Sequence, residues 1–434
     1  MDDVVGLTAE ISLDGHPLGT QCPETIKPPL VSFVLRNWNY ASYVGTAIDS
    51  IKDQDYPRFE VVVVDNGSTD DSRNVIAEHV DDDPRFSIIH SKENLGPLGG
   101  ALRGLDLVRG EFVTFVDSDD LLLPNFASYH IQVHLAARAN VAFTSSDVIE
   151  IGADGSIISG TRAAIKRLPQ EEKRGLRPAH AVPRLSGVSD SAYERLHAAT
   201  FNYQPSDYGW FWAPTSANMY RRFILQMLRP VGPPDRVRQM AVDGHYHRLS
   251  HLFGGSIFID KQLSAYRIHE NNFFSQSAGL NSLRNGGGPA TAFLEMRMCE
   301  AIRVLLENCE DRVWRMGSEW RYWSALNQLM QATGSSTLKT AQSPEFQKVM
   351  AEYFSQLVEA LGSKSTIKNL LPKLGRNSLR NIARDAYPKG VPASIRLQLL
   401  KSALFRDRLK GSSASAARET VRPSRKTSRI KKST

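Results

Sequence analysis

The stretch that decides the fold is Gly110-Glu-Phe-Val-Thr-Phe-Val-Asp117-Ser-Asp119-Asp120-Leu-Leu-Leu-Pro124. Apolar, β-favouring residues run up to three carboxylates within four positions, and Pro124 then ends the strand. This layout predicts acids at the carboxyl end of a buried strand, the edge where open α/β sheets bind ligands. Clustered carboxylates repel one another, which favours a cation site; their oxygens suit Mg²⁺ or Mn²⁺ held against a diphosphate. A solvated acidic turn is the alternative reading of an isolated Asp-x-Asp pair.

Strands and helices are expected to alternate ahead of this stretch. Apolar runs without polar alternation predict strands that are buried on both faces, at residues 28–35, 59–64 and 86–90. Helical segments are expected between them, over 41–54, from a cap at Thr69 to about residue 79, and up to about residue 108. Such alternation predicts an α/β fold with a Rossmann-like, doubly wound and mostly parallel sheet.

The order of these elements resembles that of the family 2 glycosyltransferases of the GT-A fold. The first half of the family pattern is matched by Trp38-Asn39, by Val64-Asp65-Asn66-Gly-Ser-Thr-Asp70, by Asn94-Leu-Gly96 and by Gly110 to Asp120. The second half is matched by Thr215 to Arg222, by Asp243-Gly-His-Tyr246 and by Tyr266-Arg-Ile-His269-Glu-Asn-Asn272. The resemblance covers roughly residues 29 to 275.

The resemblance implies a nucleoside-diphosphate sugar as donor and a divalent cation, Mn²⁺ or Mg²⁺, on its diphosphate. It makes Asp119 the metal ligand, with His269 as a further metal contact and Arg267 as a diphosphate contact. A structural His-Arg pair is the alternative for these last two residues. The residues expected to contact the donor nucleotide are Arg36, Trp38, Asn39, Asp65, Asn66, Asp117 and Ser118.

Inversion at the anomeric carbon needs a base that takes the proton of the attacking hydroxyl, and a placed carboxylate is the usual choice. Asp243 is the best match, and we expect it to be the N-cap of a helix from Gly244 to Leu252; capping alone is the alternative role. The family usually has an acid where Asn66 stands. An amide can still accept from the imide N–H of uracil or thymine, so a UDP- or dTDP-sugar is expected.

An aromatic cluster lies just ahead of the second-half motifs. We expect one of its rings, Trp210 or Trp212, to stack on a sugar of the acceptor side, with core packing as the alternative.

The 434 residues allow one catalytic domain and a smaller helical region. We predict an N-terminal extension, a GT-A catalytic domain with a nucleotide-binding half and an acceptor half, a Gly-rich linker, a helical C-terminal region and a basic disordered tail. Their respective bounds are 1–27, 28–284 (halves 28–120 and 121–284), 285–289, 290–410 and 411–434. The helical region is expected to pack on the catalytic domain or on a second subunit.

Composition bears on the compartment. Three cysteines without Cys-x-x-Cys spacing indicate a reducing compartment and no zinc site. We expect no signal peptide and no membrane span, hence a cytoplasmic protein. The tail from Gly411 to Thr434 carries seven Lys or Arg against one Glu, most of the chain's formal +7. We favour a tail that holds the protein at the inner, anionic face of the membrane; unspecific nucleic-acid binding or simple solubilisation fits equally.

Two classes of function follow. The first is an inverting, metal-dependent glycosyltransferase that acts on a saccharide, lipid-linked or protein acceptor, with no specific nucleic-acid partner. The second is a non-catalytic GT-A-fold scaffold that recruits partners. Asp117, Asp119, Asp243 and His269 together favour the enzyme, because a scaffold has no need of clustered carboxylates.

Overall fold

The computed structural model describes residues 27–162, 175–178, 184–185, 188–207, 209–210, 212–272, 291–331 and 343–401, and the backbone of β1 (Ile11–Leu13) and β2 (His16–Pro17). These short strands form a small sheet with β10 (Arg184–Leu185). The chain divides into two compact units, residues 1–307 with 311–340, and residues 308–310 with 341–434. The predicted linker at 285–289 and the basic tail at 411–434 lie outside the described residues.

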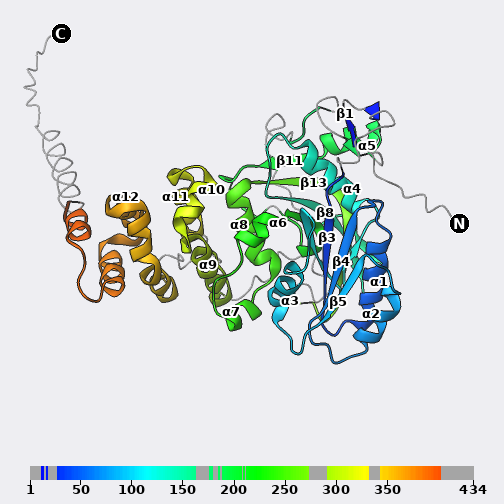
Figure 1. Ribbon diagram of the computed structural model, residues 1–434, viewed down its shortest axis with the longest axis horizontal. Helices are drawn as coiled ribbons and strands as arrows, with labels where there is room; N and C mark the ends of the chain where they lie inside the picture. Colours follow the sequence, from blue (N-terminus) through cyan, green and yellow to red (C-terminus); the bar gives the residue numbers. More distant parts are fainter. Residues whose placement is uncertain are drawn as a thin grey trace, which may run out of the picture. The chain divides into compact units, whose positions relative to one another are not determined.

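A large mixed sheet forms the centre of the first unit (Figure 1). Its strand order is β11-β13-β8-β12-β6-β3-β4-β5, with β7 paired to β13 and β9 to β8. The strands are β3 (Val31–Asn37), β4 (Phe59–Asp65), β5 (Phe86–His90), β6 (Phe112–Asp117), β7 (Leu121–Leu122), β8 (Phe143–Gly152), β9 (Ile157–Ser159), β11 (Thr200–Tyr203), β12 (Asn218–Arg221) and β13 (Ser256–Ile268).

The half of the sheet formed by residues 31–117 is parallel, as predicted. β6, β3, β4 and β5 run in the same direction. The other half is mixed, because β12 runs antiparallel to both β6 and β8, and β11 runs antiparallel to β13. β8 and β13 are again parallel to each other. The α/β prediction is therefore confirmed.

Both faces of the parallel strands are apolar because helices cover both. Phe33 and Leu35 of β3 share one core cluster with Val44 and Ile48 of α1. Val34 points to the opposite face, where the absent side chain of Gly104 in α3 leaves room for it. Figure 1 shows α1 and α2 on one side of the sheet and α3, α6 and α8 on the other. The helices are α1 (Ala41–Lys52), α2 (Ser72–Val80), α3 (Gly96–Leu105), α4 (Phe126–Ala136), α5 (Asp190–Ala198), α6 (Arg222–Met227), α7 (Pro234–Arg238) and α8 (Val242–Gly254).

The expected helix cap at Thr69 is wrong. α2 begins at Ser72, and its neighbour Asp70 accepts the Ser72 backbone N–H at 3.1 Å. The same carboxylate accepts the backbone N–H of Ala41 at 3.0 Å, at the first residue of α1. One side chain therefore satisfies free N–H groups at the start of two helices that are distant in sequence.

The C-terminal region is helical, as predicted. α9 (Thr291–Leu306) and α11 (Glu319–Gln331) belong to the first unit, and α12 (Pro344–Ala386) forms most of the described part of the second. α12 is interrupted at Gly362 and Gly375, both with positive φ, so it is a succession of shorter helices. α10 (Cys309–Met316) precedes α11, and residues 393–401 are also helical.

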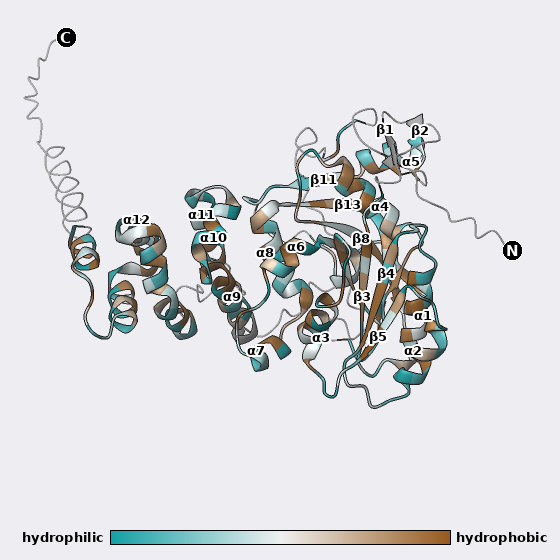
Figure 2. Cartoon of the chain, viewed as in Figure 1, coloured by the Kyte–Doolittle hydropathy of each residue, from teal (hydrophilic) through white to brown (hydrophobic). Residues whose placement is uncertain are grey.

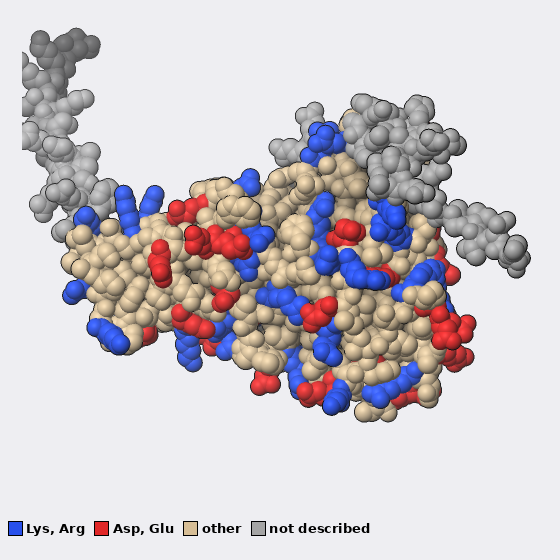
Figure 3. Space-filling view, in the orientation of Figure 1, with Lys and Arg blue, Asp and Glu red and all other residues tan. Residues whose placement is uncertain are grey.

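The surface carries charges of both signs. In Figure 2 the apolar colour is concentrated on the central strands and on the inner faces of the helices. Figure 3 shows Lys and Arg interspersed with Asp and Glu over the face in view. Among the described residues, no helix combines the length and the apolar character needed to cross a membrane.

Several histidines are buried in this core. On α4, Nδ1 of His130 lies 2.6 Å from the Thr144 hydroxyl and Nε2 of His134 lies 3.2 Å from the Met219 carbonyl oxygen. Burial lowers the pKa of His130 to about 3, because the cation would lose its hydration. Burial likewise lowers the pKa of each of three histidines on α8 to about 4, namely His245, His247 and His251.

We predict that acid weakens the fold through these histidines. Their pKa is about 6.5 in an unfolded chain, so below that pH the unfolded state binds protons that the folded state excludes. The contribution of His130 is therefore complete above about pH 6.5 and is lost as the pH falls, by about 1.4 kcal/mol per pH unit. Urea unfolding between pH 7.5 and 5 should show a shallower pH slope for His130→Asn than for the unmodified protein. Equal slopes would contradict the prediction.

Candidate functional site

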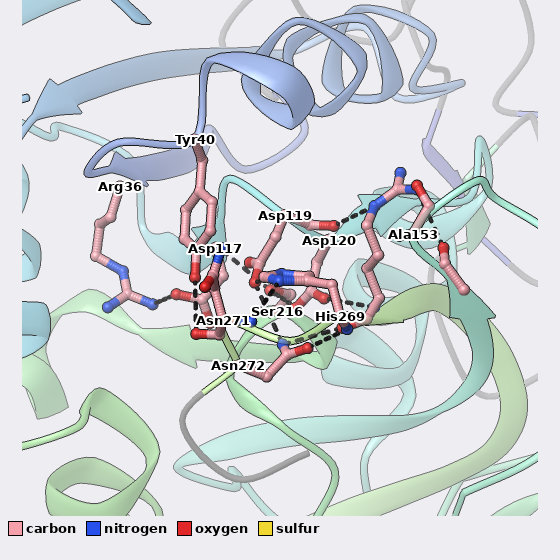
Figure 4. A network of polar contacts seen from close by, with 12 residues as sticks. Arg36, Tyr40, Asp117, Asp119, Asp120, Ala153, Ser216, His269, Asn271 and Asn272 are labelled. Atoms are coloured by element: carbon pink, nitrogen blue, oxygen red, sulfur yellow. Dashed lines mark hydrogen bonds and ion pairs between the residues drawn. The ribbon is translucent and has the colours of Figure 1, made fainter. Parts of the chain in front are cut away.

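The carboxyl ends of three neighbouring strands form the site. Strand register places Arg36 of β3 opposite Asp117 of β6, and Asn37 of β3 opposite Asp65 of β4. Figure 4 shows the side chains that gather around the end of β6. The acidic motif thus lies at the edge of the sheet where the sequence predicted it.

Asp117 forms an ion pair with Arg36, whose Nη1 also donates to the Pro97 carbonyl oxygen at 3.0 Å. The pKa of Asp117 is raised to about 6. Burial is the main cause, and the charges of Asp119 and Asp243 add to it, while Arg36 opposes them. The Asp117 carboxyl therefore takes up a proton only slightly below neutral pH. The Arg36 guanidinium holds it in place.

Asp119 faces the end of β13, more than a hundred residues later in the chain. Its Oδ2 lies 3.1 Å from Nε2 of His269 and 3.5 Å from Nδ2 of Asn272 (Figure 4). The backbone N–H of Asn271 donates to Nδ1 of His269 at 3.3 Å. The predicted pair of metal contacts, Asp119 and His269, is therefore in direct contact.

Two tyrosines that the sequence analysis did not assign enclose His269. The ring of Tyr40 lies 5.4 Å from the imidazole and the ring of Tyr43 lies 5.0 Å from it. The Tyr40 hydroxyl donates to the carbonyl oxygen of Asn271 at 3.4 Å. Burial and the nearby Asp119 and Asp117 raise the pKa of Tyr40, so its hydroxyl keeps its proton. The only signal in the sequence was the position of Tyr40 directly after the Trp38-Asn39 turn.

The third acid of the motif, Asp120, is buried and turned away from the other two. It accepts the Ser216 hydroxyl at 2.7 Å and the backbone N–H of Arg267 at 3.1 Å. Burial, with the charges of Asp119 and Asp117, raises its pKa well above the ordinary value. Ser216 Oγ also accepts the backbone N–H of Asp117 at 3.0 Å, so this serine joins the motif to the segment ahead of β12. The sequence analysis gave neither residue a role.

Arg267 serves the backbone around the motif. Its Nε donates to the Asp119 carbonyl oxygen at 2.9 Å, and its Nη1 donates to that of Ala153 at 3.1 Å. The guanidinium carbon lies 4.9 Å from the centre of the Tyr43 ring. These contacts use two of the three guanidinium nitrogens inside the protein, so a diphosphate contact would have to come from Nη2.

At the end of β4, Asp65 and Asn66 are both held within the protein. Asp65 accepts Nε of Arg73 at 2.8 Å, the backbone N–H of Ser68 at 3.2 Å, and lies 3.3 Å from Nδ1 of His90. Hydrogen bonds from these groups outweigh burial and lower its pKa. Asn66 donates both amide hydrogens, to Asn94 at 3.0 Å and to the Gly96 carbonyl oxygen at 3.1 Å, and accepts the Leu95 N–H at 3.1 Å.

The residues predicted to contact the donor after β3 and β6 differ in how far their side chains are accessible. Asn39 has a positive φ of 57° and its Oδ1 accepts the Thr69 N–H at 2.7 Å, so this side chain fastens two loops together. Trp38 next to it is 49% exposed and has a free face. Ser118 is buried, and its backbone N–H donates to the Arg36 carbonyl oxygen at 3.3 Å.

The two rings predicted to stack on a sugar, Trp210 and Trp212, differ in exposure. Trp212 is 6% exposed, donates Nε1–H to Ser256 at 2.9 Å and packs on Phe143 and His251. Its faces are therefore used in the core. Trp210 is 49% exposed and meets Trp212 edge-on at 5.4 Å, so an acceptor contact from this cluster rests on Trp210.

Asp243 lies inside the first turn of α8, which corrects the expected N-cap. The cap residue is Ala241, with extended backbone and no side-chain hydrogen bond, so the capping role of Asp243 is wrong. Its carboxylate accepts the neighbouring Gly244 N–H at 2.6 Å and lies 3.8 Å from Nη2 of Arg297. The charge of Asp243 also adds to the rise in the pKa of Asp117.

The donor set at Asp119 fits a divalent cation. Two ligands about 2.1 Å from one ion, at a right angle, are about 3 Å apart, close to the 3.1 Å between Asp119 Oδ2 and His269 Nε2. Among the described residues, no three His, Cys, Asp or Glu side chains converge on one point, so other ligands would come from substrate oxygens and water. This division is usual for Mg²⁺ at phosphate sites.

Residues 32–196 match the family model described as Glycosyl transferase family 2. This segment, and not the whole chain, matches the family 2 glycosyltransferases. The matched range of this glycosyltransferase contains Arg36, Asp65, Asn66 and the acidic motif, and it ends before Asp243 and His269. Roles for those two residues therefore rest on the geometry above.

The relatives agree with the family. An uncharacterized glycosyltransferase from Nostoc sp. is 29% identical over 252 residues, 58% of this glycosyltransferase and 69% of the relative. The succinoglycan biosynthesis protein ExoO of Rhizobium meliloti is 35% identical over 149 residues, 34% of this chain and 42% of that one. Matches to three further relatives, from Bacillus subtilis and Haemophilus influenzae, span only 29% to 48% of those proteins. Among solved structures, S. aureus TarS in complex with UDP-GlcNAc aligns with a TM-score of 0.44 and 14% identity, over 84% of this chain and 93% of that one.

We predict that Asp119→Ala abolishes metal-dependent binding of a nucleotide sugar and leaves the fold intact, because it removes the carboxylate oxygen nearest His269. Calorimetry with UDP-sugars in the presence and absence of Mn²⁺ measures this. Asp106→Ala is the matched control, since that acid pairs with Arg229 on the surface, away from the strand ends. Equal affinity of Asp119→Ala and the unmodified enzyme with Mn²⁺ would contradict the prediction.

Proposed function

We propose that this glycosyltransferase moves a sugar, with inversion, from a UDP- or dTDP-sugar to a hydroxyl of a saccharide, lipid-linked or protein acceptor. The observation that carries the proposal is the acidic motif, whose Asp119 lies 3.1 Å from His269, together with the carboxylate of Asp243 in the first turn of α8. Asp117 and Asp119 end β6, and Asp243, over a hundred residues later, lies near enough to raise the pKa of Asp117. We assign Asp117 and Asp119 to the side of the leaving diphosphate and Asp243 to the side of the attacking hydroxyl.

The donor side must stabilise the charge that grows on the diphosphate as the sugar leaves. A divalent cation would supply Lewis-acid stabilisation there, held by Asp119 and His269. Arg36 holds Asp117 and thereby keeps the end of β6 in a fixed position beside the ribose or the metal's waters. Tyr40 and Tyr43 fix the His269 ring, so these ligands are largely ordered before the donor binds.

The acceptor side needs a base that can be reached. The Asp243 side chain is 21% exposed, and its position in the first turn of α8 places it near the positive end of the helix dipole. It would take the proton of the acceptor hydroxyl as that oxygen attacks the anomeric carbon. A non-catalytic scaffold remains the second candidate, but it gives no reason for placing buried carboxylates of like charge together, which costs stability.

We predict that pyrimidine diphosphate sugars bind better than purine ones. Both donors of the Asn66 amide are used within the protein, so it offers only a remaining acceptor lone pair. One acceptor matches the single imide N–H of uracil or thymine, whereas guanine presents two adjacent donor groups and would leave one without a partner. A thermal-shift panel of UDP-, dTDP- and GDP-sugars with Mn²⁺ measures this; a ligand at a hundred times its Kd adds about 2.7 kcal/mol. Stronger stabilisation by GDP-sugars would contradict the prediction.

We predict that Asp243→Asn lowers kcat by about 10²–10⁴-fold, the usual contribution of a general base, with the donor KM little changed. The substitution keeps the shape of the side chain but removes the group that accepts the proton. Initial rates of UDP release, with and without an acceptor, check this. Near-normal turnover would mean that the base lies elsewhere and would leave the enzyme assignment on the donor side alone.

A further inference from the structure

Two buried charged residues lie one turn apart on α9, the first helix after the catalytic motifs. Arg297 is 7% exposed and Glu300 is fully buried. Both reach toward elements of the acceptor half of the site, namely the start of α8 and the loop ahead of α7. Burying two charges is expensive, so each position needs a specific partner.

Each of these side chains occupies space left by a glycine. A Cβ on Gly244 would lie 2.0 Å from Nη2 of Arg297, and a Cβ on Gly232 would lie 2.3 Å from Oε2 of Glu300. Both glycines therefore allow a charged group of α9 to lie directly on the backbone of the catalytic half. In both contacts a charged side chain of α9 packs against a glycine; the side chain is a cation in one and an anion in the other.

Glu300 fixes the position of the helix. Its Oε1 accepts the backbone N–H groups of Val231 and Gly232, at 2.8 and 2.7 Å. Hydrogen bonds from two successive N–H groups to one carboxylate oxygen hold α9 against this loop. Arg297 lies one turn earlier on the same helix. The hydrogen bonds of Glu300 therefore also fix where the Arg297 guanidinium lies along α8.

Arg297 is the cation recorded beside Asp243 among the described residues. Its Nη2 lies 3.8 Å from Oδ1 of Asp243. The other ionisable groups that interact with Asp243 are Asp117 of β6, Tyr220 of β12 and His247 in the next turn of α8. Burial lowers the pKa of Arg297, while the Asp243 charge opposes that change. A guanidinium nonetheless stays charged at any physiological pH.

We propose that Arg297 is a positioning residue for the general base, holding the Asp243 carboxylate ionised and aimed at the acceptor hydroxyl. The inference rests on the function proposed for Asp243. The separation of 3.8 Å is too long for a hydrogen bond, so the guanidinium acts through its charge and leaves the carboxylate oxygens able to accept a proton. The first helix of the C-terminal region is thereby a part of the catalytic site.

The ionisation of Asp243 can be followed without any substrate. In protein labelled with carbon-13 at aspartate side chains, the Asp243 signal is identified by its loss in Asp243→Asn. We expect this carboxylate to titrate at higher pH in Arg297→Gln than in the unmodified protein. Arg303→Gln is the matched control, because Arg303 lies on the same helix and faces Glu300 at 4.0 Å. An unchanged Asp243 titration in Arg297→Gln would overturn the proposal.

Kinetics separate this inference from the function on which it rests. We expect Arg297→Gln to lower kcat for UDP release by about 10–100-fold, the scale of a misplaced catalytic group, with partial rescue in Arg297→Lys. Gly244→Ala should have a similar effect, because its methyl group displaces the guanidinium. In the Asp243→Asn background, Arg297→Gln should cost little more, since both act through one carboxylate.

The outcomes have distinct meanings. Full multiplication of the two losses in the double variant would show a purely structural role for Arg297 and overturn the inference. Normal turnover of Asp243→Asn would instead overturn the assignment of the base, whatever Arg297 does. Folding of each variant is checked by its thermal unfolding temperature, with Arg303→Gln as the reference.

Discussion

The structure depends on one constraint, which is the repulsion among the three carboxylates that end β6. Each is accommodated differently. Asp117 pairs with a cation, Arg36. Asp119 contacts polar side chains at the end of β13. Asp120 accepts the Ser216 hydroxyl and a backbone N–H, and its pKa is raised well above the usual range. A low-dielectric environment strengthens the repulsion between these carboxylates. Each of the three sets of contacts is therefore needed to keep the end of β6 folded.

This constraint explains why the second half of the chain returns to the first. β12 inserts antiparallel beside β6, and the segment before it brings Ser216 under the acidic motif. The end of β13 brings His269 and Asn272 to Asp119, and Arg267 fastens the motif's backbone to the β8–β9 turn. The mixed half of the sheet therefore contributes to the candidate site as much as the parallel half, although it lies largely beyond the range that the family model matches.

α9 belongs to the same assembly. Its Glu300 is held by two backbone N–H groups of the loop ahead of α7, and its Arg297 rests on the glycine that follows Asp243. A helix that follows the catalytic motifs in sequence thus contacts the first turn of α8. This offers a physical reason for a compact unit that runs through α9 and α11 and leaves α12 in the second unit.

The sequence by itself determined the α/β class, the strand that carries the acids, the parallel half of the sheet and the helical C-terminal region, because these follow from local runs of apolar residues and their punctuation. Local signals misplaced the ends of helices: Thr69 and Asp243 are good capping residues, yet α2 and α8 begin elsewhere. Tertiary structure alone decided that Trp212 is core while Trp210 is exposed, and that the Asn66 amide donates to Asn94 and Gly96. It also decided that Ser216 contacts Asp120, that Tyr40 packs on His269, and that Arg297 lies beside Asp243. Those facts depend on strand register and helix packing between residues far apart in the chain, and no local pattern in a single sequence encodes them.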